Sequence, residues 1–159
     1  MSTVQPRPPI VLQPAGWDQL DAVMAIMARA FDPNFGEAWT RAQCAGILPM
    51  HGVKMMLAGE MDRPLGFSLT RMVADEAELL LLAVAPEARR MRIGSMLMVH
   101  FSEQAQTFGA SRLHLEVRDG NPAADLYARH QFSIAGRRPN YYRGADGQMF
   151  DALTMARRI

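Results

Sequence analysis

The aliphatic run at residues 79–84 and the basic turn that follows it constrain this chain more than any other segment. A short, unbroken apolar run that ends before Pro86 predicts a strand buried on both faces. Residues 89–95, with the letters RRMRIGS, then lead into an amphipathic helical pattern. The first turn of a helix has N–H groups without intrahelical partners, and its dipole favours negative charge. Residues 89–95 therefore predict an anion site, with a solvated basic turn before a core helix as the alternative.

Length and composition place the chain among single-domain globular proteins. We expect one domain spanning residues 1–159, and 49% hydrophobic against 21% charged residues is an ordinary balance for a packed core. The formal net charge of +1 argues against a general nucleic-acid binder, so no nucleic-acid partner is expected.

Other features argue against a disulfide-bonded, metal-binding, secreted or membrane protein. Cys44 is the only cysteine, so an intrachain disulfide and a CxxC zinc site are excluded. The four histidines show no HExxH spacing, and we expect no metal. Residues 1–9 have too little apolar character for a signal peptide and are expected to form a loose leader. No segment approaches the ~20 apolar residues of a membrane span, so we expect a cytoplasmic protein without a membrane partner.

The first half of the chain predicts one strand, two helices and three more strands. A strand at residues 10–13 precedes an amphipathic helix at 17–31, and Thr40 is a suitable N-cap for a second helix that ends near residue 48. Residues 53–59, 65–73 and 77–85 predict strands that the short turns between them make antiparallel neighbours.

The second half predicts a crossover and a closing hairpin. A helix at residues 93–108 separates the strand at 77–85 from an alternating strand at 112–118, so these two strands are expected to be parallel. A short helix follows, with Asn121 as N-cap and Pro122 as its first residue. Residues 134–136 and 149–155 predict a strand pair around a loop at 137–148. The predicted fold class is α/β: a mixed sheet, combining an antiparallel meander with a parallel βαβ crossover, flanked by helices.

The element order and several motifs resemble the GNAT superfamily of acetyl-coenzyme A-dependent N-acetyltransferases. The RxxGxG/A motif of that superfamily aligns with residues 89–94, RRMRIG. From residue 79 onward the chain is most similar to one branch, the bacterial ribosomal-protein-alanine N-acetyltransferases of the RimI type. The matching segments are LEVR at 115–118, LY at 126–127, RPNYY at 138–142 and DA at 151–152. Before residue 65 the resemblance rests on element order alone.

The resemblance implies an enzyme that moves the acetyl group of acetyl-coenzyme A to a protein N-terminal α-amine, with a ribosomal protein among the candidate acceptors. It implies that Glu116 accepts the proton of the amine and that Tyr127 donates a proton to the leaving thiolate. The residues implied to hold acetyl-coenzyme A are Leu82, Ala83, Val84, Arg89, Arg90, Met91, Arg92, Ile93, Gly94, Ser95 and Asn121. Those implied to bind the acceptor are Arg138, Tyr141 and Tyr142. The oligomeric state is left open.

The chain departs from the family pattern at three points. Arg92 and Gln131 stand where the family has glycine, and the segment from Asn121 to Tyr127 is one residue shorter. A side chain at position 92 crowds a turn whose backbone would approach a pyrophosphate. These departures motivate one rival function, an acyl-coenzyme A binding module without catalysis. The other rival is an enzyme of the same fold that acetylates a small amine.

The two catalytic assignments are chemically reasonable. An α-amine has a reference pKa of about 7.7–8.0, against about 10.4 for lysine, so a carboxylate base has modest work to do. Tyrosine, with a pKa of about 10, keeps its proton at neutral pH. Structural roles are the alternatives: a solvent-facing strand residue for Glu116, a core aromatic for Tyr127, an N-cap for Asn121, and hairpin-loop residues for Tyr141 and Tyr142.

Overall fold

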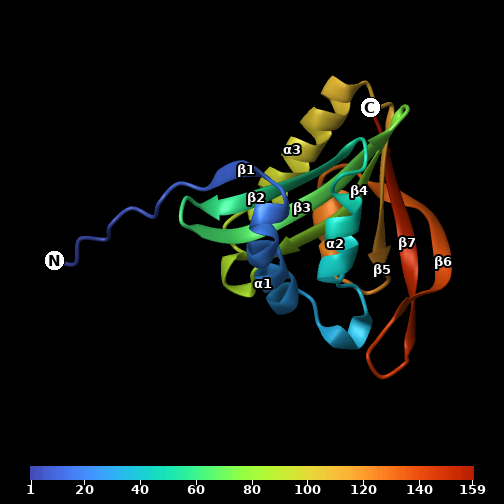
Figure 1. The fold of residues 1–159 in the computed structure, drawn as a ribbon, viewed down its shortest axis with the longest axis horizontal. Coiled ribbons are helices and arrows are strands. Elements are labelled where there is room, and N and C mark those ends of the chain that lie inside the picture. The colour runs from blue at the N-terminus through green and yellow to red at the C-terminus, as the bar shows by residue number, and fades with distance from the viewer.

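The computed structural model describes residues 1–159 and contains one seven-stranded sheet in the order β1-β2-β3-β4-β5-β7-β6 (Figure 1). The strands are β1 (Val11–Ala15), β2 (Val53–Glu60), β3 (Arg63–Val73), β4 (Glu76–Val84), β5 (Arg112–Arg118), β6 (Ser133–Arg143) and β7 (Met149–Arg158). The helices are α1 (Leu20–Ala30), α2 (Arg41–Ile47), α3 (Ile93–Phe108) and α4 (Ala123–Arg129). Short 3-10 turns lie at Trp17–Gln19, Pro33–Phe35 and Pro86–Ala88. The predicted α/β class is confirmed.

The sheet combines the predicted antiparallel meander with one parallel pair. Strands β1 to β4 are antiparallel neighbours, whereas β4 and β5 are parallel and are joined through α3. β7 then inserts between β5 and β6 and pairs with both in the antiparallel sense. Helices α1 and α2 pack on one face of the sheet, and α3 and α4 pack on the other (Figure 1).

A bulge in β4 decides which layer each of its side chains joins. Leu69 of β3 pairs with Leu81, and Thr70 pairs with Leu79, so Leu80 has no partner in β3. Residues two apart in a regular strand share a face, but here Leu79 packs in the α3 layer and Leu81 packs in the α1 layer. Pairing between β4 and β5 ends at the same point, with Leu79 opposite Leu115. Beyond it the two strands diverge.

The closing hairpin differs from the prediction. The sequence predicts a loop at residues 137–148, but β6 continues to Arg143 and the connection to β7 covers only residues 144–148. Arg138, Tyr141 and Tyr142 therefore lie on a strand and not on a loop. The register of β6 against β7 shifts between Arg138 and Tyr142, and Asn140 there has a φ of +53°. This irregularity breaks the alternation from which a strand is predicted.

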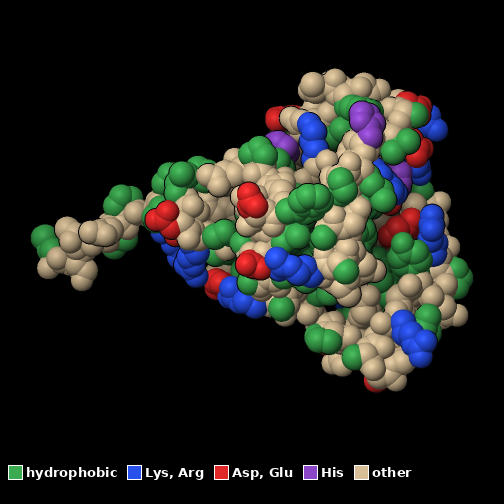
Figure 2. Space-filling view, in the orientation of Figure 1, with side chains coloured by type: hydrophobic (Ala, Val, Ile, Leu, Met, Phe, Trp, Pro, Cys, Tyr) green, Lys and Arg blue, Asp and Glu red, His purple; other side chains and the backbone are tan.

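The first ten residues contain no helix or strand, and this segment projects from the body of the molecule (Figure 2). Lysine, arginine and acidic side chains are interspersed over the face seen in Figure 2, and the chain as a whole has a formal net charge of only +1. None of the helices combines the length and the apolar character that crossing a bilayer would need.

Candidate active site

A cavity of about 750 Å³ opens where β4 and β5 diverge. Most of the predicted site residues meet there. Those that line the cavity are Leu82, Ala83, Val84, Arg89, Arg90, Arg92, Gly94, Ser95, Glu116, Asn121, Tyr127, Tyr141 and Tyr142. Met91, Ile93 and Arg138 do not line it, and Ile93 is fully buried beneath the turn. The roles of all these residues stay predictions, but the structure brings most of them together.

One end of the cavity, which we call the donor end, is made mainly of backbone. β4 pairs with β3 from Leu82 to Val84. Its opposite edge has no partner there, because pairing with β5 stops at Leu79. The free N–H and C=O groups of such an edge can bind an extended, amide-containing chain in the way that a neighbouring strand would.

The turn between β4 and α3 presents unsatisfied amides at the same end. The first backbone hydrogen bond of α3 runs from the N–H of Met96 to the carbonyl of Arg92. The N–H groups of Arg92, Ile93, Gly94 and Ser95 have no partner in the protein. Consecutive free amides at a helix start form a concave site that binds anions, and the dipole of α3 adds to the effect. The turn therefore suits a pyrophosphate group.

The backbone of this turn explains why the family pattern has glycine at position 92. Arg92 has a φ of +60°, and Gln131, the other residue at a family glycine, has a φ of +73°. Only glycine adopts this left-handed region without strain, and other residues are disfavoured there by about 1 kcal/mol. Gly94 fits for another reason: a Cβ at that position would lie 3.0 Å from Cδ2 of Leu126, so the Leu126 side chain would have to shift by a few tenths of an ångström.

Two side chains of the turn connect it to neighbouring helices. Arg89 donates from Nη2 to the carbonyl oxygen of Ala30, at the end of α1, over 3.2 Å. The hydroxyl of Ser95 lies 3.2 Å from Nε2 of His130, which follows α4. Burial, with a smaller effect of nearby arginines, lowers the pKa of His130 and favours the neutral imidazole. These contacts hold the turn against both helix layers.

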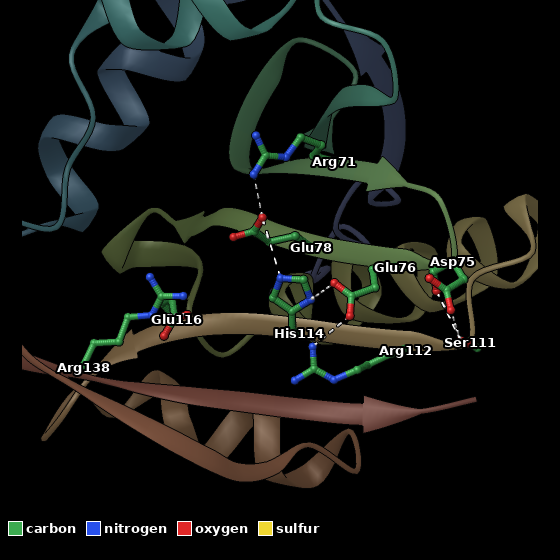
Figure 3. Close-up of polar contacts among 9 residues, drawn as sticks. All are labelled: Arg71, Asp75, Glu76, Glu78, Ser111, Arg112, His114, Glu116 and Arg138. Carbon is green, nitrogen blue, oxygen red and sulfur yellow. Dashed lines mark hydrogen bonds and ion pairs between the residues drawn. The ribbon is translucent and has the colours of Figure 1, made fainter.

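Glu116 lies on β5 just beyond the point where β4 separates from it, and its side chain is only 10% exposed. Its Oε2 atom accepts a hydrogen bond of 2.7 Å from the hydroxyl of Thr154. Its Oε1 atom lies 3.2 Å from Nε of Arg138. Figure 3 shows the two side chains next to each other. The Arg138 side chain is 60% exposed and can move without a large change in solvation. The carboxylate is therefore held in the cavity wall by one half-buried and one exposed partner.

The other charges on this face of the sheet neutralise one another (Figure 3). His114 lies between Glu76 and Glu78, 3.9 and 3.8 Å from their carboxylates, and its Nδ1 atom has no hydrogen-bond partner. Each glutamate also pairs with an arginine, Glu78 with Arg71 at 2.8 Å and Glu76 with Arg112 at 3.3 Å. These carboxylates are engaged within the sheet and offer the cavity little free negative charge.

Tyr127 reaches the same cavity from α4, despite the shortened segment that precedes it. The residue is only 6% exposed. Burial raises the pKa of Tyr127 well above its usual value, and the negative charge of Glu37 adds to the shift. The phenol therefore keeps its proton throughout the physiological range. A buried carboxylate on β5 and a protonated phenol on α4 thus line one cavity.

Glu37 is a site residue that the sequence pattern does not indicate. It lies between α1 and α2, lines the cavity, and has an 11% exposed side chain. Its Oε1 atom accepts a 2.6 Å hydrogen bond from Nε of Arg118, and Oε2 accepts one of 2.6 Å from the amide of Asn121. The oxygen of the Asn121 amide accepts from the N–H of Ala123, the first residue of α4. The helix begins one residue later than predicted, so Pro122 and not Asn121 is at the N-cap position.

The sequence pattern could have indicated Arg118 as a site residue, but it could not have indicated its partner Glu37. The alternation of β5 places Arg118 beside Glu116, and a buried arginine requires an acid. The acid that pairs with it lies 81 residues earlier in the chain, in a segment without a motif. The guanidinium also stacks 3.7 Å from the centre of the Phe35 ring, which packs edge-on against Phe150.

Strand β6 supplies an aromatic wall to the other end of the cavity, which we call the acceptor end. The rings of Tyr141 and Tyr142 meet edge to face with centroids 4.9 Å apart, and Arg138 lies 5.7 Å from the Tyr141 ring centre. Burial raises the pKa of Tyr142, with the charges of Glu37 and Glu116 among the further causes. Together with Glu37 from the α1–α2 connection and Glu116 from β5, these side chains of β6 form the acceptor end.

The comparisons with known proteins agree with this geometry. The chain matches the Acetyltransferase (GNAT) family over residues 20–132, which is more than half of its length. It belongs to the GNAT acetyltransferase family. One curated GNAT relative is the [ribosomal protein bS18]-alanine N-acetyltransferase of Salmonella typhimurium, 43% identical over 96 residues. That match covers 60% of this chain and 64% of the relative, so the chain spans a little under two thirds of the length of that relative.

Two further N-acetyltransferases are similar over more of their length. The putative [ribosomal protein bS18]-alanine N-acetyltransferase of Bacillus subtilis is 32% identical over 127 residues, covering 79% of this chain and 82% of that protein. The crystal structure of the ribosomal-protein-S18-alanine N-acetyltransferase of Escherichia coli superposes with a TM-score of 0.82 at 30% identity. That superposition covers 95% of this chain and 94% of the other.

Proposed function

We propose that this chain is an N-acetyltransferase that moves the acetyl group of acetyl-coenzyme A to the α-amine of a protein N-terminus. The observation that carries the proposal is the single cavity lined together by Glu116, Tyr127 and the free edge of β4. Membership of the GNAT family supports the reaction class. A protein acceptor is supported by the similar proteins whose names give the alanine of a ribosomal protein as the acetylated residue.

The donor end fits acetyl-coenzyme A, whose thioester supplies an activated acetyl group. Leu82, Ala83 and Val84 offer a free strand edge to the amide-containing arm of the molecule. The amides of residues 92–95 offer hydrogen bonds to its pyrophosphate, and the arginines of the turn add positive charge. Asn121, with both ends of its amide engaged inside the protein, is proposed to shape the cavity wall beside the donor.

Glu116 is proposed to accept the proton of the amine. Its Oε1 atom becomes available when the exposed Arg138 side chain gives way, while Thr154 keeps the carboxylate oriented through Oε2. Glu37 is a poorer base, because both of its oxygens already accept hydrogen bonds of 2.6 Å. An α-amine with a pKa of about 8 needs only modest help to lose its proton.

Tyr127 is proposed to stabilise the departing sulfur. The Oη atom holds its proton, because the pKa of this phenol is raised well above that of a thiol, about 8.5. The hydroxyl can therefore donate a hydrogen bond to a sulfur on which negative charge develops. Arg138, Tyr141 and Tyr142 are proposed to hold the acceptor peptide at the opposite end of the cavity.

The experiment is an acetyl-transfer screen read by mass spectrometry. Short peptides with different first residues, alanine among them, are compared with a panel of small amines, and acetyl-coenzyme A binding is measured separately by calorimetry. We expect acetylation at the α-amine of peptides. Turnover of small amines alone would indicate a small-amine acetyltransferase. Tight acetyl-coenzyme A binding without any turnover would indicate a binding module.

A further inference from the structure

The ladder between β6 and β7 is interrupted between Arg138, which contacts Glu116, and Tyr142, which lines the cavity. Arg138 pairs with Ala152, whereas Tyr142 pairs with Phe150, so three residues of β6 face the single residue Asp151. Regular pairing from Arg138 onward would place Tyr142 two positions further along β7, opposite Gln148 in the turn. The irregularity thus shifts Tyr142 by two positions of β7, about 7 Å along the strand at 3.4 Å per residue, and in this register Tyr142 lines the cavity.

Asp151 holds this bulge together. Its Oδ1 atom accepts a 3.0 Å hydrogen bond from the N–H of Asn140, the bulge residue with φ of +53°. This N–H belongs to the interrupted stretch, where the ladder registers no Cα partner. The second oxygen, Oδ2, lies 2.9 Å from Nη1 of Arg137. The Asn140 amide first, and then Arg137, lower the pKa of Asp151, which stays ionised at neutral pH.

Asp151 also connects the bulge to the end of β5. Its backbone carbonyl accepts from the N–H of Asp119 over 3.0 Å. Arg137 bridges the two carboxylates, with Asp119 at 2.7 Å. Asp119 directly follows Arg118, the partner of Glu37. One residue of β7 therefore ties the bulge of β6 to the strand that carries Glu116.

We infer that Asp151 is a positioning residue that orients Tyr141 and Tyr142 toward the acceptor by bonding the N–H of Asn140. The inference rests on the proposed function and extends it to a residue that does not line the cavity. Loss of this bond leaves a left-handed Asn140 without its restraint, so the bulge can relax toward regular pairing. A displacement of this kind misplaces the acceptor and leaves the donor end unchanged.

The test compares Asp151→Ala, Asp151→Asn and Arg137→Met. Asp151→Ala removes the bond to Asn140, and we expect the peptide KM to rise about tenfold to a hundredfold with an unchanged acetyl-coenzyme A Kd. Asp151→Asn keeps an oxygen for the Asn140 N–H, and Arg137→Met removes only the two ion pairs of Arg137, with Asp119 and with Asp151. Both are expected to stay within about threefold of the parent, because exposed ion pairs contribute little.

Asp146→Ala is the matched control, because Asp146 also accepts a backbone hydrogen bond, from Gln148 at 2.9 Å, but in the turn of the same hairpin. It should lower the Tm comparably without changing the peptide KM. Hydrogen exchange of residues 137–143 gives a readout that needs no activity, and it should rise in Asp151→Ala alone. Equal effects of Asp151→Ala and Asp146→Ala on KM, or unchanged exchange in Asp151→Ala, would overturn the inference. A parent that acetylates no peptide would instead refute the proposed function, while exchange would still test the role of Asp151.

Discussion

The donor end of the cavity is made mainly of backbone groups, whereas the acceptor end is made of side chains. The donor end uses contiguous residues, from the free edge of β4 through the turn to the start of α3, and it presents backbone amides. The acceptor end uses side chains from the α1–α2 connection, β5 and β6, which ion pairs and hydrogen bonds hold together.

This difference predicts how each end tolerates substitution. A backbone site depends on conformation, so Arg92 can replace the family glycine if the turn keeps its left-handed geometry. A side-chain site depends on partners far apart in the chain, and removing one partner leaves the other buried without a counter-charge. We therefore expect changes at the acceptor end to be larger than changes at the donor end.

The largest effect should come from Glu116→Gln. This change keeps the shape of the side chain and its contact with Thr154 but removes the basic carboxylate, so kcat should fall by about 10² to 10⁴-fold. Calorimetry should show an unchanged Kd for acetyl-coenzyme A. Glu76→Gln, on the same face of the sheet but outside the cavity, is the control and should retain parent activity. Parent-like turnover in Glu116→Gln would mean that the amine is deprotonated elsewhere.

The second effect concerns the Arg118–Glu37 pair. Both side chains are about nine-tenths buried, so Glu37→Leu should lower the free energy of unfolding by about 3 kcal/mol by leaving Arg118 unpaired. The double variant Glu37→Leu/Arg118→Met should recover part of this loss, because no buried charge is then left alone. Urea unfolding measures the free energy of unfolding of the single and of the double variant. Strictly additive losses would show that the two side chains do not depend on each other.

The third effect tests the backbone character of the donor end with a matched pair of glycine substitutions. Arg92→Gly and Gln131→Gly both relieve a positive φ and should raise the unfolding free energy by similar amounts, about 1 kcal/mol or less. Only Arg92→Gly should weaken acetyl-coenzyme A binding, a few-fold at low salt, because it alone removes a charge from the turn. A Kd change that persists at high salt would point to altered turn geometry instead.

The smallest effect concerns pH. His130 has a folded-state pKa below its unfolded value of about 6.5, so at lower pH the unfolded chain binds a proton that the folded protein resists. Its contribution to stability is complete above pH ~6.5 and is lost as the pH falls toward the folded pKa. When the Tm is measured against pH for the parent and for His130→Gln, the two curves should therefore diverge below pH ~6.5. Superimposable profiles would show that the Ser95–His130 contact does not couple to protonation.

The sequence by itself determined most of the regular elements and the turn at the donor end. The bounds of α3 and β5 agree with the predicted ranges, because amphipathic spacing, Gly109 and strand alternation are local signals. The basic turn likewise predicted free amides at the start of a helix, since turn and helix lie in one contiguous segment, whereas the free edge of β4 beside them arises only where its pairing with β5 ends. Glu116 and Tyr127 were identified through a family resemblance, and the structure places them in one cavity.

Only the tertiary structure decided the acceptor end. The pairing of Glu37 with Arg118, the bulge that replaces the expected loop, and the bond from Asn140 to Asp151 each join residues without a shared local pattern. The β4 bulge at Leu80 belongs to the same group, because an apolar run looks the same whether its ladder is regular or interrupted. Local patterns report the periodicity of a single element, whereas contacts between distant elements exist only after the sheet has brought them together.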